Sequence, residues 1–227
     1  MNKFQLVTSF LIASFFTISC QQNGEKTPAK TTETTTKEGA KSKKNILFFG
    51  NSLTAGYGLD DASTAGFVGL TQQKIDSLDL PYRCVNAGLS GETTAGGNSR
   101  IDWVIEQQPV DIFILELGGN DALRGLKAAD SERNLQSILD KVKAKYPSVK
   151  IILSGMEAPR SMGNAYTSAF HNIYPTLAKK NAIALIPFVL EGVGGIAELN
   201  QKDGIHPTAE GNKIIVETIW DVLKPLL

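Results

Sequence analysis

The sequence of 227 residues contains few cysteines and histidines, two of each. Cys20 lies near the N-terminus and Cys84 is the only other cysteine, so no disulfide framework can stabilise a mature domain. Cys84 lies in the strand-like run Tyr82 to Val85, where we expect it to be a small buried hydrophobic residue. Asp203 and His206 could bind a metal ion, but no recognisable cluster supplies the remaining ligands. We therefore expect no metal ion at these residues.

The sequence also lacks a surplus of charge, since 23 Lys and Arg are balanced by 23 Asp and Glu. Domains that bind nucleic acid present a basic surface, so a nucleic-acid partner is not expected. The glycine-rich segment Gly50 to Gly58 has no lysine that could reach a phosphate, which argues against a phosphate-binding loop. No Gly-x-Ser-x-Gly sequence occurs, which argues against the α/β-hydrolase fold.

The N-terminus has the form of an export signal. Lys3 precedes an apolar run from Leu6 to Ile18 that has no acidic residue and is too short to span a membrane comfortably. We predict a signal peptide over residues 1–20. Residues 21–44 are rich in Thr, Lys and Glu and cannot bury enough apolar surface to fold, so we predict a flexible polar tether. The folded domain is then expected over residues 45–227.

Cys20 ends the predicted signal peptide, and this arrangement resembles the signals of bacterial lipoproteins. In those proteins the cysteine is acylated after cleavage. The resemblance implies lipidation of Cys20 and a domain exported and anchored by lipid to the cell envelope, periplasmic or at the outer membrane. The alternative is simple secretion with a free cysteine.

Short apolar runs alternate with longer segments of helical period in the predicted domain. Strands in strict alternation with helices, each strand nearly all apolar, indicate a parallel sheet that is covered on both faces. We therefore predict an α/β fold, a three-layer α/β/α sandwich around a five-stranded parallel sheet. The expected strands are 45–49, 82–86, 111–117, 149–154 and 183–187, and the expected helices are 66–78, 100–107, 131–146, 166–180 and 209–223.

The clearest helix is the one expected over residues 131–146. Leu135, Ile138, Leu139 and Val142 repeat at the spacing of one helix face, which predicts that this face is buried. Ser131, or Asp130 before it, can cap the start of the helix with its side chain.

In an open parallel sheet, ligands bind beyond the C-terminal ends of the strands. Four segments after the predicted strands carry polar or glycine-rich sequence. They are the segments that hold Ser52, Asn86 to Thr94, Leu117 to Asp121, and Asp203 to Pro207. We therefore expect the functional residues to come from these four segments.

Together these segments contain the parts of a serine hydrolase. A serine hydroxyl becomes a nucleophile when an imidazole takes its proton, and a carboxylate on the other ring nitrogen orients that imidazole. Ser52 is the candidate nucleophile, His206 the base, and Asp203 the orienting carboxylate, because a tight turn can bring residues 203 and 206 together. The peptide N–H groups of Ser52 and Gly91 and the Asn120 amide are suitable donors to an oxyanion.

These residues also resemble a known family. Gly50-Asn51-Ser52-Leu53, Gly91, Gly119-Asn120-Asp121 and Asp203-Gly204-Ile205-His206-Pro207 look like the four sequence blocks of the SGNH, or GDSL-type, hydrolases, in order and spacing. The likeness extends over residues 45–227 and is closest to the branch of bacterial arylesterases, acyl-thioesterases and lysophospholipases. It implies a flavodoxin-like sandwich, a small-molecule ester as substrate, and no metal or cofactor.

One position departs from the family pattern. The family usually has aspartate immediately before the serine, and this chain has Asn51. Asparagine keeps the hydrogen-bonding capacity but not the charge. Since that aspartate does not orient the histidine, we expect activity to survive, and to survive also in an Asn51→Asp variant.

Two other candidates are weaker. Gly97-Asn98-Ser99 repeats the tripeptide around Ser52, but it comes before a predicted helix and not after a strand. His171 lies among apolar residues of a predicted helix, where a structural role is expected.

The substrate is less well defined by sequence. Met156 favours an apolar pocket wall, Arg160 could meet a polar head group, and Asn51 adjoins the nucleophile. We expect an aryl ester, acyl thioester or lysophospholipid. The alternatives are O-acetyl groups on envelope or dietary glycans, or a surface lipoprotein that binds a lipid or glycan without turnover. The oligomeric state cannot be read from the sequence.

Overall fold

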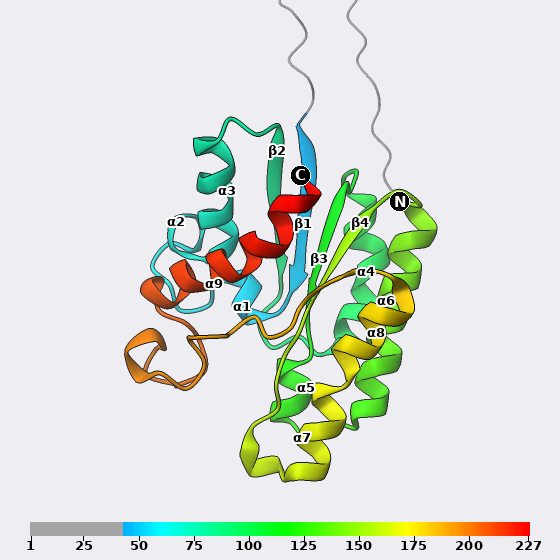
Figure 1. Ribbon diagram of the computed structural model, residues 1–227, viewed down its shortest axis with the longest axis vertical. Coiled ribbons are helices and arrows are strands. Elements are labelled where there is room, and N and C mark those ends of the chain that lie inside the picture. The colour runs from blue at the N-terminus through cyan, green and yellow to red at the C-terminus, as the bar shows by residue number, and fades with distance from the viewer. Residues whose placement is uncertain (1–42) are drawn as a thin grey trace, which may run out of the picture. The chain divides into compact units, whose positions relative to one another are not determined.

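The computed structural model describes residues 43–227 (Figure 1). The predicted signal peptide over 1–20, the lipidation site Cys20 and residues 21–42 of the predicted tether lie outside the described residues. Within the described part, no helix is both long enough and apolar enough to cross a membrane.

Five parallel strands form one sheet in the order β2-β1-β3-β4-β5. The strands are apolar because helices cover both faces of the sheet; in β1 every residue from Asn45 onward is buried. The predicted α/β/α sandwich is confirmed. The strands are β1 Lys44–Gly50, β2 Tyr82–Gly88, β3 Ile112–Glu116, β4 Lys150–Ser154 and β5 Ala184–Ile186.

Helices form a layer on each face of the sheet (Figure 1). One layer pairs α3, the crossover from β1 to β2, with the C-terminal helix α9, and the other packs α4 against α6 and α6 against α8. The longer helices are α3 Phe67–Ser77, α4 Thr94–Glu106, α6 Ala128–Lys145, α7 Asn164–His171, α8 Ile173–Asn181 and α9 Ala209–Leu223. Three short helices, α1 Ser52–Ala55, α2 Ala62–Ala65 and α5 Gly119–Leu123, and three 3₁₀ turns, 160–162, 197–199 and 224–226, complete the described elements.

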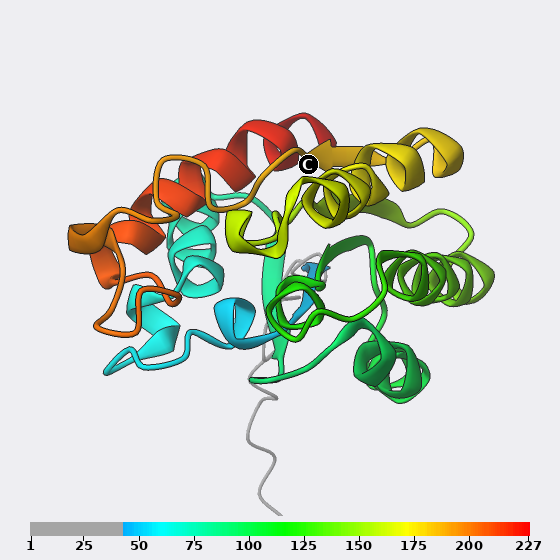
Figure 2. The same ribbon diagram turned by 90° about the horizontal axis from the view of Figure 1, so that it is seen from below.

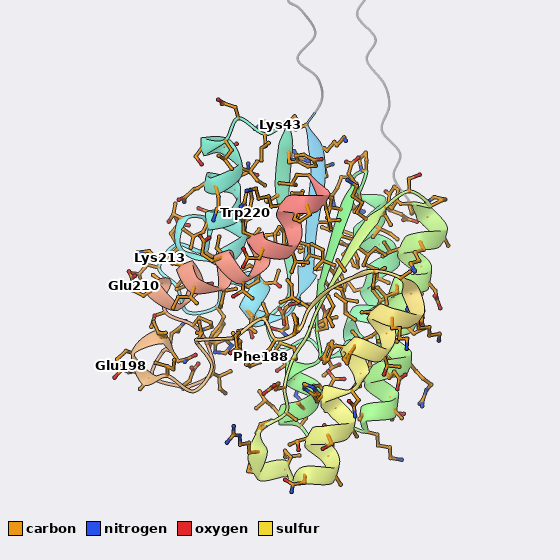
Figure 3. The ribbon with its side chains drawn as sticks, in the orientation of Figure 1. Lys43, Phe188, Glu198, Glu210, Lys213 and Trp220 are labelled. Carbon is orange, nitrogen blue, oxygen red and sulfur yellow. The ribbon has the colours of Figure 1, made fainter. Side chains whose placement is uncertain are left out.

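The layers are held by apolar contact, with polar pairs at their outer edges. The predicted inner face of α6 is buried, since Leu135, Ile138, Leu139 and Val142 are fully inaccessible to solvent. Between α3 and α9, the Lys74 ammonium lies 5.1 Å from the centre of the Trp220 ring, which Figure 3 labels. On the outer side of α9, Lys213 and Glu210 form an exposed ion pair, also labelled there.

Several predicted helix boundaries were wrong. The helix expected at Arg100 begins at Thr94, so Gly97-Asn98-Ser99 lies inside α4 and not before it. The helix expected over 166–180 is divided at Asn172 into α7 and α8. The cap expected from Ser131 or Asp130 is absent, because α6 already begins at Ala128 and the Ser131 hydroxyl donates to Asp121 instead.

The strand order reverses beside β1, and this reversal places the site. From β1 the chain crosses to β2 on one side and then returns to β3 on the other. The two crossovers leave in opposite directions, so their loops separate and open a crevice at the C-terminal ends of β1 and β3. Figure 2, turned to the view from below, shows the loops at this end of the sheet.

Candidate active site

The turn after β1 presents Ser52 as the first residue of α1. The Asn51 side chain caps this helix by accepting from the Leu53 N–H at 2.9 Å, which satisfies one otherwise free helix donor. Gly56 ends the helix in the left-handed conformation, with φ of 72°. A single helical turn therefore holds Ser52, whose side chain is mostly buried, at the floor of the crevice.

His206 lies between Ser52 and Asp203. Its Nε2 is 2.8 Å from the Ser52 Oγ, and its Nδ1 is 2.6 Å from the Asp203 Oδ2. Both distances are those of good hydrogen bonds. The structure thus brings together the three side chains that the sequence singled out, although Ser52 and His206 are 154 residues apart in the chain.

Asp203 is fixed by its own turn. Its Oδ1 accepts from the peptide N–H groups of Ile205 at 2.9 Å and His206 at 3.0 Å, and Gly204 adopts a positive φ of 69° that allows the tight bend. The hydrogen bond from His206, followed by those two peptide donors, lowers the pKa of Asp203 to about 2. An ionised carboxylate only accepts, so Nδ1 carries the ring proton and Nε2 is free to accept from Ser52.

The loop that carries His206 is tied to the turn that follows α1. Gln201 donates from Nε2 to the carbonyls of Tyr57 at 2.8 Å and Pro207 at 3.0 Å. The Tyr57 ring then lies against the His206 ring, with 4.7 Å between their centres. Tyr57 and Gln201 were missed by the sequence reasoning, which took only the histidine and carboxylate from this end of the chain.

Two loops present the candidate oxyanion donors. The Asn120 Nδ2 donates to the Glu92 carbonyl at 3.0 Å, which ties the loop after β3 to the loop after β2. Gly91 lies in the latter loop with φ of 80°, and Arg124 donates to its carbonyl at 3.0 Å. The peptide N–H groups of Gly91 and Ser52 have no hydrogen-bond partner among residues 43–227.

A partly buried ion pair supports the loop that carries Gly91. Arg100 on α4 donates two hydrogen bonds to the Glu92 carboxylate, at 2.8 and 2.5 Å, and a third to the Ala87 carbonyl. Charge-assisted, two-point pairs of this kind fix geometry as well as adding energy. The Glu92 backbone, which receives the Asn120 amide, is therefore held in place.

A cavity of about 430 Å³ opens above Ser52 and His206. Its wall is mainly apolar, with Met156 as a buried member, and Asn51, Gly91, Asn120 and Asp203 also line it. The apolar lining residues are Leu53, Tyr57, Leu123, Met156, Pro159, Leu190 and Ile205.

Two residues considered from sequence lie elsewhere. Arg160 and His171 line a separate hollow, and the exposed His171 ring is 3.8 Å from the Glu157 carboxylate. Arg160 is therefore not among the residues that line the pocket above Ser52. His171, for which the sequence indicated a structural role, is an exposed residue at the end of α7.

The chain between residues 43 and 227 has no group of three His, Cys, Asp or Glu side chains placed to hold a metal ion. Cys84 is partly buried and packs on the core, and burial, with the nearby Asp76 charge, raises the pKa of its thiol to about 12.

A buried carboxyl beneath Ser52 was also missed. Glu116 is the last residue of β3, and its side chain accepts hydrogen bonds from Asn51 and Thr54. Burial raises the pKa of Glu116 to about 7, although these hydrogen bonds act in the opposite direction. One signal was present in the sequence, since Glu116 is the single charge in an otherwise apolar strand.

Comparison with known proteins agrees with this architecture. The model of the GDSL-like lipase/acylhydrolase family matches residues 48–214. Esterase TesA of Pseudomonas aeruginosa is 39% identical over 184 residues, 81% of this chain and 90% of that protein. Thioesterase 1/protease 1/lysophospholipase L1 of Escherichia coli K12 is 35% identical over 182 residues, 80% and 84% of the two chains. A crystal structure of TesA matches with a TM-score of 0.76 and 38% identity, over 81% of this chain and all of that one.

The fold and these matches define the class of the protein, a carboxylic ester hydrolase. The chain belongs to the GDSL-like lipase/acylhydrolase family.

The raised pKa of Glu116 predicts a pH-dependent stability. Its folded pKa of about 7 exceeds the ordinary value of 4.5, so the folded protein binds more protons than the unfolded chain between these pH values. Stability should therefore fall as pH rises from about 5 to 8. We expect the melting temperature to drop by a few degrees over this range from this group, given about 2–4 °C per kcal/mol for a domain of this size. Calorimetry at several pH values measures the melting temperature.

The control is the Glu116→Gln variant, which cannot titrate at this position. Its melting temperature should vary less steeply between pH 5 and 8, whatever its absolute stability. Equal slopes for the two proteins would contradict the raised pKa.

Proposed function

We propose that the protein hydrolyses acyl esters through a Ser52-His206-Asp203 triad and a covalent acyl-enzyme. The observation that carries the proposal is the continuous row of hydrogen bonds from the Ser52 hydroxyl through the His206 ring to the Asp203 carboxylate. In this arrangement the nucleophile, its base and the orienting group stand in the order that serine acyl transfer requires.

The reaction proceeds in two halves. The Ser52 oxygen attacks the ester carbonyl carbon while its proton moves to the His206 Nε2. The tetrahedral intermediate collapses, the bond to the alcohol or thiol breaks, and the leaving group takes the proton from His206. Water then attacks the acyl-enzyme, giving its proton to His206, which returns it to Ser52 as the acid leaves. Asp203 remains ionised and stabilises the imidazolium in both halves.

The oxyanion of each intermediate is bound by donors from three loops. The peptide N–H groups of Ser52 and Gly91 are unpaired within the described residues, and the Asn120 amide lies in the same pocket. Donors fixed before the reaction begins need no reorganisation as charge develops, and one such donor is typically worth about 10²–10³ in turnover.

The pocket wall favours an apolar acyl group as substrate. Leu123, Met156 and Leu190 offer a surface that gains from burying methylene groups and has few partners for sugar hydroxyls. The names of two similar proteins, esterase and thioesterase/lysophospholipase, support acyl esters, acyl thioesters or lysophospholipids as substrates. An O-acetylated glycan is the second candidate, and the polar lining residues Ser90, Glu157 and Asn200 would be the partners of its hydroxyls.

Replacement of Ser52 by alanine should reduce hydrolysis of a short-chain aryl ester to background, because no other described hydroxyl lies against the His206 Nε2. Turnover of p-nitrophenyl butyrate and labelling by a fluorophosphonate probe are the measurements. The matched control is Ser99→Ala, in the second Gly-Asn-Ser tripeptide, where the hydroxyl is exposed and donates to Ala95 in α4. Undiminished turnover in folded Ser52→Ala protein would refute the triad, and native protein that is not labelled would favour a binding protein.

A substrate panel should show the preference of the pocket. We expect kcat/KM for p-nitrophenyl esters to rise about tenfold or more from acetyl to hexanoyl, because each buried methylene is worth about 0.8 kcal/mol. The same enzyme should release little acetate from acetylated xylan. Faster release from xylan than from any aryl or thioester would reverse the ranking of the two candidates.

We also propose that the enzyme is exported and anchored to the bacterial envelope through a lipid on Cys20. The support is the sequence alone, an apolar segment that ends at Ser19-Cys20 and is followed by a polar stretch. Cells expressing the full chain and fed an alkyne-labelled fatty acid should incorporate the label, and Cys20→Ala should lose it. Cys84→Ala is the matched control, because Cys84 is partly buried inside the domain. Label retained in Cys20→Ala would contradict the anchor.

A further inference from the structure

Glu116 lies directly below residues 51–54, which we call the nucleophile turn, and outside the pocket. Glu116 is 2% exposed. Parallel pairing of β3 with β1 places it beside Gly50, which lies two residues before Ser52 in the sequence. An isolated charge at such a site is strongly unfavourable, so a buried carboxyl is expected to have partners that define its role.

Among the residues that the structure describes, the hydrogen-bond partners of this carboxyl all come from the nucleophile turn. Its Oε1 accepts from the Asn51 Nδ2 at 2.8 Å, and its Oε2 accepts from the Thr54 hydroxyl at 2.8 Å and the Asn51 peptide N–H at 3.3 Å. These donors flank Ser52 on both sides in the sequence. One rigid strand end therefore holds the turn at three points.

The fit leaves no room for a side chain at Gly50. A Cβ at this position would lie 2.1 Å from the Thr54 hydroxyl oxygen and 2.6 Å from the Glu116 Oε2. The glycine thus lets the carboxylate approach the backbone of the turn closely.

The Asn51 amide is oriented at both ends. Its Nδ2 donates to Glu116, while its Oδ1 accepts from the Leu53 N–H at 2.9 Å and lies 3.4 Å from the Ser52 Oγ. Rotating the amide would place two donors together at Leu53 and two acceptors together at Glu116. The carboxylate therefore fixes the group that borders the nucleophile.

We propose that Glu116 is a positioning residue for Ser52, acting through the Asn51 amide and the Thr54 hydroxyl to hold the serine oxygen in line with His206. This role rests on the proposed function of Ser52 as the nucleophile. A displacement of about 1 Å from a productive geometry can lower turnover by about 10².

The other titratable groups near this carboxyl are few. Tyr174 on α8 is buried, and its pKa is raised by that burial and by the charges of Glu116 and Asp121, the latter on α5. His206 and Asp203 lie on the pocket side of Ser52, and Asn51 and Thr54, on the turn itself, do not titrate. Donor and acceptor matching at the Asn51–Glu116 pair can therefore be varied with little change to other charges.

Exchanging the amide and the carboxyl group between positions 51 and 116 tests the proposal. In Glu116→Gln the new amide must place a donor against either the Asn51 amide or the Asn51 peptide N–H, so one hydrogen bond is lost. In Asn51→Asp two carboxyls face each other and must share a proton. In the double variant Asn51→Asp/Glu116→Gln every donor again meets an acceptor, because the new amide at position 116 donates to the new carboxylate at position 51.

We expect Glu116→Gln to lower kcat for p-nitrophenyl butyrate about tenfold to hundredfold, with KM within about twofold, and to slow fluorophosphonate labelling similarly. Asn51→Asp should stay active but below the native enzyme at pH 8. The double variant should recover kcat to within about threefold of native. All assays are run well below each variant's melting temperature, so a loss of stability alone would not change kcat.

Thr54→Val provides a second test of the proposal if Glu116→Gln does not fold, because it removes the hydroxyl that donates to Glu116. Loss of this one donor should lower kcat about threefold to tenfold. Thr71→Val is its matched control, because Thr71 is an equally buried threonine whose hydroxyl donates to Phe67 within α3. Its kcat should be unchanged.

The proposal would be overturned if folded Glu116→Gln turned over substrate within twofold of native, or if the double variant were no better than both single variants. A failure of the proposed function is separate: the native protein would then not be labelled, or Ser52→Ala would keep its turnover.

Discussion

The parallel pairing of β1 with β3 is the constraint on which the site depends. Their register ends with Gly50 opposite Glu116, so the turn that carries Ser52 and the turn that carries Asn120 leave the sheet side by side. Because the strand order reverses at β1, the crossovers to β2 and β3 leave the space between these turns open. A shift in this register would separate Ser52 from the Glu116 carboxyl below it and from the Asn120 amide.

The remaining contacts tie separate loops to this pair of strands. Arg100 fixes the Glu92 carboxylate, Asn120 joins the Glu92 carbonyl, and Gln201 joins the His206 loop to Tyr57 in the turn that follows α1. Each link connects segments that are distant in sequence or belong to different elements. The site is thus built from loops but has the rigidity of the sheet beneath it, which suits chemistry that needs aligned donors before the substrate binds.

Two patterns in the sequence carried most of the fold prediction. Strands buried on both faces are continuous apolar runs, and the face of α6 repeats at helical spacing, so element type and order could be read directly. Helix starts were harder. Gly96 and Gly97 lower the helix propensity of this segment, yet the helix begins at Thr94, and a Cβ at Gly97 would lie 2.4 Å from the Leu117 side chain. Tertiary packing here outweighs helix propensity.

Residues of the candidate site could be predicted where residue type and short spacing indicate a chemical role. Ser52, Asp203 and His206 stand in short glycine-containing turns whose residue types are informative by themselves. Tyr57 was missed because a tyrosine in a loop has no distinctive local pattern. Glu116 stands out as a single charge in an apolar strand, but its partners are set by strand pairing and were not readable from the sequence. Arg160 was misplaced, because the direction in which a loop points depends on what it packs against.

The sequence by itself determined the alternation of strands and helices, the family, and the three side chains of the candidate triad, because these depend on residue type and short spacing. Only the tertiary structure decided that the carboxyl of Glu116 lies under Asn51 and Thr54, that Tyr57 lies on His206, and that Arg160 stays outside the pocket. Those relations come from strand register and from packing between distant segments, which no local pattern of residues encodes.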